Sequence, residues 1–272
     1  MSPGDQPTAM DVAVVNWNTA EAALRAANGY LASSGVEARV TIVDNASLPE
    51  QRELLREGKP ADVRLEENQE NLGYGRAANW VLAAGEAELV CVSNADLLPD
   101  PEALAALAAV ALGEPEAGMV GPVFEGETAR YHAKLPGSVA MLGRIFAGSF
   151  ARGAVEQPPP GKVSEVGQPS GACFVVRREV WERVGGFDEG FFLWYEDVDL
   201  AKRLHGAGYR NLVVGSARVE HSGAGAFAQL DRRRQQSIRL DSVERYIGKH
   251  HSGIAPVARP LLTISRKLRA DG

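Results

Sequence analysis

Carboxylate and amide side chains stand at the ends of four apolar runs in this 272-residue chain, where they could bind a ligand together. In chain order these side chains are Asn16 and Asn18, Asp44 and Asn45, Asn68 and Asn71, and Asn94 and Asp96. Oxygen ligands without a His or Cys cluster suit a hard cation such as Mg²⁺ or Mn²⁺, which bridges a carboxylate to phosphate groups. We therefore predict that Asp96 holds a metal ion that neutralises a diphosphate, and that Asp44 accepts hydrogen bonds from a base or ribose. Each residue taken singly is also typical of a turn or a helix N-cap.

A second group of acids, Glu196, Asp197 and Asp199, follows the aromatic run FFLWY and opens a predicted helix. A carboxylate held against aromatic surface has a raised pKa, which suits it to act as a general base. Acids at a helix start also interact favourably with the helix dipole, so the pattern by itself leaves a structural role open. Asp199 precedes Arg203 by one helical turn, and we expect these two side chains to form an ion pair.

Strand-like and helical patterns alternate over the first half of the chain. The predicted strands cover residues 11–18, 38–47, 62–68 and 87–96, and the predicted helices cover residues 19–35, 49–58, 72–85 and 101–112. This alternation predicts an α/β fold with a mostly parallel sheet sandwiched by helices. Ligands of such sheets bind at the carboxyl ends of the strands. The polar residues described above are therefore expected to share one rim.

The second half of the chain is less regular. Residues 125–168 show little periodicity, so we predict a long irregular segment, and a segment of this kind inside a compact domain is usually functional or mobile. Order returns with a strand and short helix over 171–187, a helix late in 191–209 and a strand over 211–221. His221 ends that strand; a lone His is more often structural, but this one could complete a metal or phosphate site.

The end of the chain is predicted to be helical from residue 226 to His250, with a looser tail beyond Pro256. No linker divides the sequence into independent units. We therefore predict one α/β domain over residues 1–225 and a helical extension over residues 226–272, packed on that domain or flanking it.

Two phosphate-binding motifs would each indicate a different class of nucleotide-binding protein. Residues 73–78 fit G-x-G-x-x-A, the dinucleotide fingerprint, but the match falls in the third strand–helix unit and lacks an acid at the usual distance. No G-x-x-x-x-G-K-[ST] motif occurs in the sequence, which excludes a P-loop NTPase. A dehydrogenase is accordingly disfavoured.

As an ordered set, these motifs resemble the inverting family 2 glycosyltransferases of the GT-A fold, and most closely the rhamnosyltransferase-like members. The segments that carry the resemblance are VVNWN, VDNAS, NLGYGRAAN, SNADLLPDP, the stretch from GACFVV to HGAGY, and EHSGAGAF, between Asp11 and Phe227. The resemblance implies transfer of a sugar from a nucleoside diphosphate donor, with dTDP-rhamnose as the leading candidate, to a hydroxyl of a glycan or lipid-linked acceptor.

The resemblance also implies roles for single residues. The residues expected to contact or shape the nucleotide-sugar pocket are Asn16, Asn18, Asp44, Asn71, Gly73, Asn79 and Asn94. Asp197 is expected to be the catalytic base, with Glu196 as its alternative, and Trp194 and Tyr195 are expected to bind the acceptor. Asp96 and His221 are expected to hold Mg²⁺ or Mn²⁺.

One position departs from the family pattern, because Asn94 replaces the first acid of the Asp-x-Asp metal motif. An amide is a poorer ligand for these cations than a carboxylate, so the substitution predicts weaker metal binding. It also leaves open a catalytically silent module that binds sugar nucleotides. A nucleotidyltransferase is a further alternative, although the Gly- and Lys-rich phosphate loop of that class does not occur near residue 11.

Composition narrows the setting in which the chain acts. The net charge of −6 gives no general attraction to nucleic acid. The two cysteines lie in apolar runs, where we predict reduced thiols. The sequence shows no signal peptide and no apolar run of spanning length, which predicts a cytoplasmic protein. The last forty residues are basic, a pattern that is usually a solvated helix face; peripheral contact with the inner face of a membrane or with a lipid-linked substrate is the alternative.

Overall fold

The computed structural model of the chain describes residues 7–125, 134–147, 158–222 and 229–270. Its strands are β1 (Thr8–Asn16), β2 (Val36–Asp44), β3 (Arg64–Glu67), β4 (Leu89–Asn94), β5 (Leu97–Pro99), β6 (Ala117–Glu125), β7 (Val163–Val166), β8 (Cys173–Arg177) and β9 (Arg210–His221). Its α-helices are α1 (Ala20–Leu31), α2 (Pro49–Gly58), α3 (Tyr74–Leu82), α4 (Ala103–Gly113), α5 (Ser138–Ala147), α6 (Arg178–Val184), α7 (Glu196–Gly206), α8 (Arg232–His250) and α9 (Ala255–Ala270), with a short 3₁₀ turn, η2 (Ser252–Ile254), before α9.

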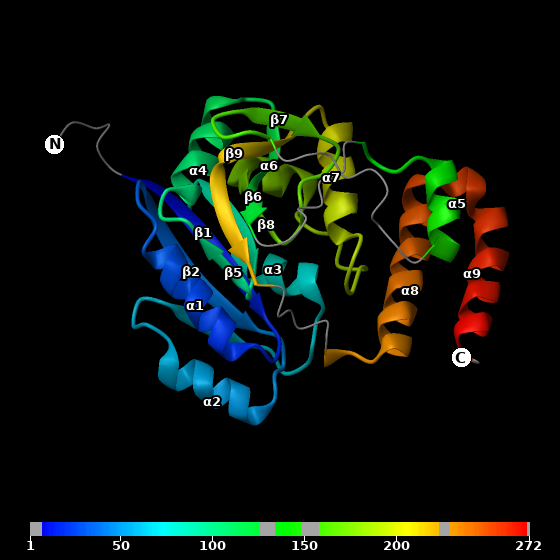
Figure 1. Ribbon diagram of the computed structural model, residues 1–272, viewed down its shortest axis with the longest axis horizontal. Coiled ribbons are helices and arrows are strands. Elements are labelled where there is room, and N and C mark those ends of the chain that lie inside the picture. Colours follow the sequence, from blue (N-terminus) through cyan, green and yellow to red (C-terminus); the bar gives the residue numbers. More distant parts are fainter. Residues whose placement is uncertain (1–6, 126–133, 148–157, 223–228, 271–272) are drawn as a thin grey trace.

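The strands form a single mixed sheet in the order β3-β2-β1-β4-β8-β6-β9-β5, with β7 paired to β9 (Figure 1). The first four strands run parallel, as the alternating sequence pattern predicts, and β8 then pairs antiparallel to β4. The register places Asn16 opposite Asp44 and Val15 opposite Asn94. The rim predicted from the sequence therefore exists at the ends of β1, β2 and β4.

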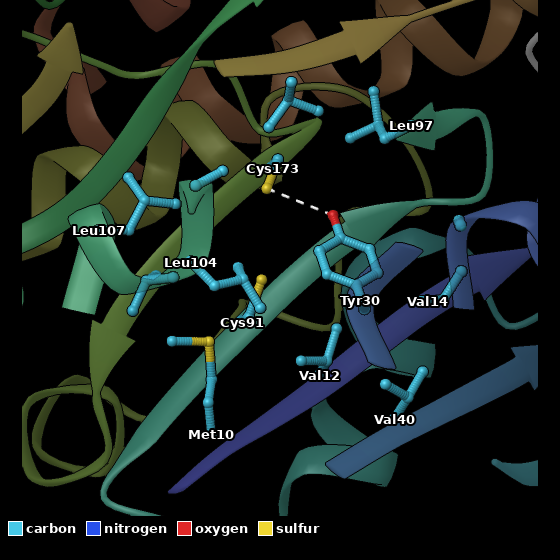
Figure 2. Close-up of a cluster of buried hydrophobic side chains, with 14 of the residues drawn as sticks. Met10, Val12, Val14, Tyr30, Val40, Cys91, Leu97, Leu104, Leu107 and Cys173 are labelled. Carbon is cyan, nitrogen blue, oxygen red and sulfur yellow. Dashed lines mark hydrogen bonds between the residues drawn. The ribbon is translucent and has the colours of Figure 1, made fainter. Parts of the chain in front are cut away.

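One face of the sheet is covered by α1 and α4, whose alanines let the helices approach the strands closely. The large side chain in this layer is Tyr30, which reaches across the core in Figure 2. Its hydroxyl donates to Ser93 Oγ at 2.7 Å and lies 3.6 Å from Cys173 Sγ. Both Cys173 and Cys91 are buried free thiols, which confirms the sequence-based prediction.

The opposite face is covered by α3, α6 and α7. Its aromatic centre is the edge-to-face pair Trp181 and Phe187, whose ring centroids are 5.2 Å apart. The two layers together bury the sheet on both sides, as expected for parallel strands.

A third apolar cluster joins α5, α8 and α9 to the start of α7 at one end of the molecule (Figure 1). Two expectations are wrong here. Residues 138–147 form a helix within the segment predicted to be irregular, and α9 replaces the loose tail expected beyond Pro256. Pro256 lies in the first turn of α9, where the missing N–H costs no helical hydrogen bond. Predicted helical residues 226–228 lie outside the described part.

Within the described residues, the model contains no helix that is both long enough and apolar enough to span a bilayer.

Candidate active site

A cavity of about 280 Å³ opens at the carboxyl ends of β1 and β4. Its walls come from the strand ends, from the start of α3, from the segment before α7 and from α8. The lining residues include Asn16, Asn45, Asn71, Gly73, Asn94, Asp96, Phe192, Leu230, Arg234 and Ile238. The structure therefore brings Asn16, Asn71, Gly73, Asn94 and Asp96 together, as the sequence predicts.

Asp44 lies behind this wall and is fully buried. Its carboxylate accepts a 2.9 Å hydrogen bond from Asn16 Nδ2 and a short one from the Ser47 hydroxyl, and lies 3.2 Å from Arg52 Nε. Asp44 therefore orients Asn16 toward the cavity without lining the cavity itself. Asn18 also lies outside the lining, where its Oδ1 accepts from Leu48 N at 2.7 Å. Direct contact of Asp44 or Asn18 with a nucleotide remains a prediction.

Asn45 belongs to the predicted polar rim and directly follows β2, but it was not among the residues expected to shape the nucleotide-sugar pocket. Its Nδ2 donates to Asn71 Oδ1 at 2.9 Å and to the Gly73 carbonyl at 3.0 Å. Its Oδ1 accepts from Leu72 N at 2.8 Å and from Asn68 Nδ2 at 3.1 Å. One buried amide thus fixes the loop that leads into α3. The sequence signal that could have identified Asn45 is the Asp44-Asn45 pair directly after an apolar run.

Gly73 has a φ of +84°, and a Cβ at this position would lie 2.3 Å from the Phe192 carbonyl oxygen. That oxygen accepts a 2.9 Å hydrogen bond from Tyr74 N, which ties α3 to the segment before α7.

We expect Gly73→Ala to lower the free energy of unfolding by about 2 kcal/mol or more, because the strain of the left-handed backbone and the clash with the Phe192 carbonyl add. Urea unfolding would measure this loss. Gly113→Ala, with nothing within 4 Å of its new Cβ, is the control and should be nearly neutral; equal losses would contradict the explanation.

Asn79 does not belong to the cavity, contrary to the prediction. Its Oδ1 accepts from Phe187 N and its Nδ2 donates to the Phe187 carbonyl, both at 2.9 Å. This paired geometry fixes the loop after α6 against α3. Asn79 was assigned to the pocket because it shares a sequence motif with Gly73. It lies six residues further along α3, however, and its side chain projects away from the cavity at the helix start.

Asp96 and His221 come together at the turn between β4 and β5. Leu97 in β5 pairs with His221 in β9, and the His221 Nε2 lies 3.3 Å from Asp96 Oδ2. The Asp96 side chain is buried, and its Oδ2 has no hydrogen-bond partner. Asp96 lines the cavity, and a carboxylate oxygen without a hydrogen-bond partner beside an imidazole fits the donor set of a divalent cation. No group of three or more His, Cys, Asp or Glu that could bind a metal occurs in the described ranges. Substrate oxygens would therefore have to complete the coordination.

Asp197 begins α7 beside the cavity, without being part of its lining. Its Oδ2 accepts from Gln168 Nε2 at 2.5 Å and from Gly171 N at 3.1 Å. Burial raises the pKa of the Asp197 carboxyl, and these N–H donors oppose part of that rise. Burial and the neighbouring charge of Asp197 together raise the pKa of Glu196 well above its usual value. The buried Glu196 Oε2 has no hydrogen-bond partner.

Two consecutive residues before α7 have left-handed backbone conformations, with φ of 63° at Trp194 and 68° at Tyr195. Non-glycine residues rarely adopt this region, and strain of this kind gathers at functional sites. The side chain of Tyr195 is only 1% exposed and packs 5.3 Å from the Tyr246 ring. The left-handed backbone turns the Tyr195 ring into the third cluster and not toward an acceptor, so contact of Tyr195 with an acceptor stays a prediction that this geometry does not support. Trp194 is half-buried, and its contact with an acceptor remains a prediction.

Asp199 is fully buried and forms the predicted ion pair with Arg203, at 2.7 Å. Two residues of α8 also reach it, Lys249 Nζ at 2.8 Å and His250 Nε2 at 2.6 Å. This cluster of charges anchors the last turn of α8 to α7.

The first turns of α8 supply a cavity wall that was not predicted. Asp231 caps the helix by accepting from Arg234 N at 2.9 Å, and the side chains of Leu230, Arg234 and Ile238 line the cavity. The exposed guanidinium of Arg234 adds positive charge to a site that otherwise presents amides and Asp96. The basic run Arg232–Arg234 was visible in the sequence, but its position depends on the fold.

The family follows from a match of residues 7–239 to the model described as glycosyltransferase-like family 2. The chain belongs to this family. This family 2 chain is 36% identical over 184 residues to the N-acetylglucosaminyl-diphospho-decaprenol L-rhamnosyltransferase of Mycobacterium tuberculosis, and the match covers 60% of each protein. It is also 30% identical over 153 residues to the O-antigen biosynthesis protein RfbC of Myxococcus xanthus, covering 54% of this chain and 12% of that one.

Solved structures show that the family 2 chain has the predicted GT-A fold. A mannosyltransferase from Pyrobaculum calidifontis, in complex with GDP-Man and Mn²⁺, superposes with a TM-score of 0.60 at 19% identity, covering 96% of this chain and 76% of that one. GalNAc-T7 with UDP, GalNAc and Mn²⁺ gives a TM-score of 0.54 at 16% identity, covering 80% and 44%. Both of these neighbours were solved with Mn²⁺.

Proposed function

We propose that the chain is an inverting glycosyltransferase that moves L-rhamnose from a dTDP-linked donor to a hydroxyl of a lipid-linked or other glycan acceptor. One arrangement carries this proposal: Asp96 lines the cavity and lies 3.3 Å from His221, and Asp197 follows Leu193, which lines the same cavity, by four residues. The mycobacterial relative is named as an L-rhamnosyltransferase with a diphospho-decaprenol acceptor, which favours rhamnose and a lipid-linked substrate. The two free thiols are consistent with action in a reducing compartment, at the inner face of a membrane.

The proposed reaction is a single displacement at the anomeric carbon. The acceptor hydroxyl passes over the apolar wall formed by Phe192 and Trp194 and gives its proton to the Asp197 carboxylate. The new carbon–oxygen bond forms as the bond from the anomeric carbon to the diphosphate oxygen breaks, so the configuration inverts. Gln168 and Gly171 N hold the Asp197 carboxylate in position and favour its ionised form.

The diphosphate side of the reaction requires positive charge. Asp96 and His221 would hold Mg²⁺ or Mn²⁺, and Asn94 lines the same part of the cavity. When bound, the cation would stabilise the charge that develops on the leaving diphosphate. Arg234 contributes a second cation from α8. Asn16 and Asn71, fixed by buried partners, would orient the nucleotide.

The division into an α/β domain over residues 1–225 and a helical extension over residues 226–272 is also proposed. The extension packs on the domain through the third cluster and through the ion pairs at Asp199. Since α8 forms part of the cavity wall, the extension completes the donor site instead of serving as an independent unit.

Calorimetric titration of the full chain with dTDP, UDP and GDP, each with Mn²⁺ and with chelator, tests the donor site. We expect dTDP to bind most tightly and Mn²⁺ to strengthen its binding. Incubation with dTDP-rhamnose and an N-acetylglucosaminyl diphospholipid should then yield the rhamnosylated lipid with an inverted anomeric configuration. A preference for UDP or GDP would overturn the proposed donor, and retention of configuration would overturn the mechanism.

A silent sugar-nucleotide-binding module is the second candidate, favoured by the amide of Asn94 at the position of the first metal-binding acid. In that case nucleotides would bind in the titration while no donor sugar would be transferred or hydrolysed.

A further inference from the structure

Helix α9 carries two apolar stripes, and only one of them is buried by the rest of the protein. Ala258, Leu262 and Ser265 face the third cluster and are buried. Val257 and Ile264, seven residues apart, are 56% and 48% exposed. Pro260, one turn after Val257, is also exposed, so positions 257, 260 and 264 form one outward face of the helix. Leu261 is half-buried and packs against the third cluster.

Helix α5 packs against α9 and adds to this exposed apolar area. Val139 is 85% exposed, and Ala140 and Gly143 on the same helix are also exposed. Single exposed hydrophobic residues are ordinary. Here, however, Val139, Val257 and Ile264 lie on two neighbouring helices at the end of the molecule away from α2 (Figure 1). We call these three residues, together with Arg259 and Lys267, the α5–α9 surface.

Charge distinguishes the C-terminal helices from the rest of the protein, although Arg232–Arg234 lie in the first turn of α8 and not on α9. Residues 229–272 contain ten Lys and Arg against four Asp and Glu, although the chain as a whole has a net charge of −6. On α9, the exposed Arg259 and Lys267 form no ion pair with any residue that the structure describes. Arg266 is paired with Asp241 at 2.7 Å and therefore contributes less. Lys267 follows Ile264 by three residues and lies next to the exposed apolar stripe, whereas Arg259 lies at the other edge of the exposed side of α9.

We propose that the α5–α9 surface docks on an anionic lipid bilayer, with Val139, Val257 and Ile264 entering the headgroup boundary and Arg259 and Lys267 meeting lipid phosphates. Apolar side chains beside basic ones, on a helix that lies along the surface, are the features of an interfacial membrane helix. A second copy of the chain is a poorer occupant, because two basic surfaces would repel each other. This inference rests on the proposed function insofar as a lipid-linked acceptor is itself held in a membrane.

Co-sedimentation with vesicles tests this surface without donor or acceptor. We expect the full chain to bind vesicles of phosphatidylcholine and phosphatidylglycerol in equal parts, to bind pure phosphatidylcholine more weakly, and to be released by salt. The double variant Val257→Asp with Ile264→Asp should lose about tenfold or more in affinity. Val163→Asp is the matched control, because Val163 on β7 is as exposed as Ile264, at 48%, and should leave binding unchanged.

The basic component is tested with Arg259→Glu and Lys267→Glu, which should weaken binding to the anionic vesicles but not the residual binding to phosphatidylcholine. Calorimetric binding of dTDP should be unchanged in all variants, which shows that they fold. Absence of vesicle binding by the parent chain, or unchanged binding by the Val257/Ile264 variant, would overturn the proposal. Self-association of the parent chain that the same variant abolishes would also overturn it, in favour of a second copy. Vesicle binding without glycosyl transfer would refute the proposed function while leaving this surface intact.

Discussion

Asp197→Asn is expected to lower the turnover number by about a thousandfold, because general-base catalysis typically contributes 10²- to 10⁴-fold. The amide has the same shape as the carboxylate, and its one oxygen can still accept the hydrogen bonds from both Gln168 and Gly171, because both donors contact Oδ2. Nucleotide affinity should therefore stay close to that of the parent chain, since the Asp197 side chain lies outside the donor cavity. Steady-state kinetics with saturating donor, together with calorimetry, would separate the two effects.

The pH dependence gives a second signature of the same residue. Because burial raises the pKa of Asp197 and the base must be ionised, turnover by the parent chain should fall on acidification at a higher pH than an ordinary aspartate would give. Glu196→Gln is the matched control at the adjacent position, and it should keep substantial turnover. Near-normal turnover by Asp197→Asn, with activity lost in Glu196→Gln, would reassign the base to Glu196.

Thermal unfolding checks that the Glu196→Gln variant is folded. The structure also predicts the sign of the change in its melting temperature. The pKa of Glu196 is raised in the folded state, so the native chain binds this proton more tightly than the unfolded chain does. Stability from this group is therefore present below the usual glutamate pKa and is lost as pH rises through the raised one. Glu196→Gln should raise the melting temperature at neutral pH, and the difference should vanish in acid.

Asp96→Ala is expected to weaken dTDP binding strongly when Mn²⁺ is present and hardly at all with chelator. Loss of a group that only orients a metal ligand already costs about 10- to 100-fold in metal affinity, so loss of the carboxylate itself should cost at least that. The effect is expected at this residue because the buried Asp96 Oδ2, beside His221, is the oxygen expected to bind the cation. Paired titrations with and without Mn²⁺ measure the effect directly.

The control for this variant is Asp100→Ala, which removes an exposed acid just after β5. Its metal-dependent increase in dTDP affinity should match that of the parent chain. If Asp96→Ala kept the full increase, the cation would have to bind elsewhere, and the role assigned to Asp96 and His221 would be refuted.

The rim of polar residues could be predicted because the carboxyl ends of parallel strands lie along the same edge of a sheet. An Asn or Asp ends each of β1, β2 and β4, and the parallel register of these strands then places Asn16, Asp44 and Asn94 along one rim. The ion pair between Asp199 and Arg203 was equally predictable, since helical spacing is local. These features depend on short stretches of sequence.

The failures concern the direction of side chains and contacts between distant segments. Tyr195 was assigned to the acceptor side, but its left-handed backbone turns the ring toward Tyr246, which is fifty-one residues away in the sequence. Asn79 shares a motif with Gly73, yet it binds the backbone of Phe187. Arg234 reaches the cavity only because the third cluster and Asp199 position α8. No local pattern encodes these placements.

The position of α8 also bears on how the protein is made. The last strand of the sheet, β9, ends at His221, whereas the wall built by Leu230, Arg234 and Ile238 lies later in the chain. Chains are synthesised from the N-terminus, and their earlier parts fold first. The ribosome therefore completes the sheet before it completes the wall of the cavity, and a nascent chain can form the full cavity only after the first turns of α8 have emerged and docked.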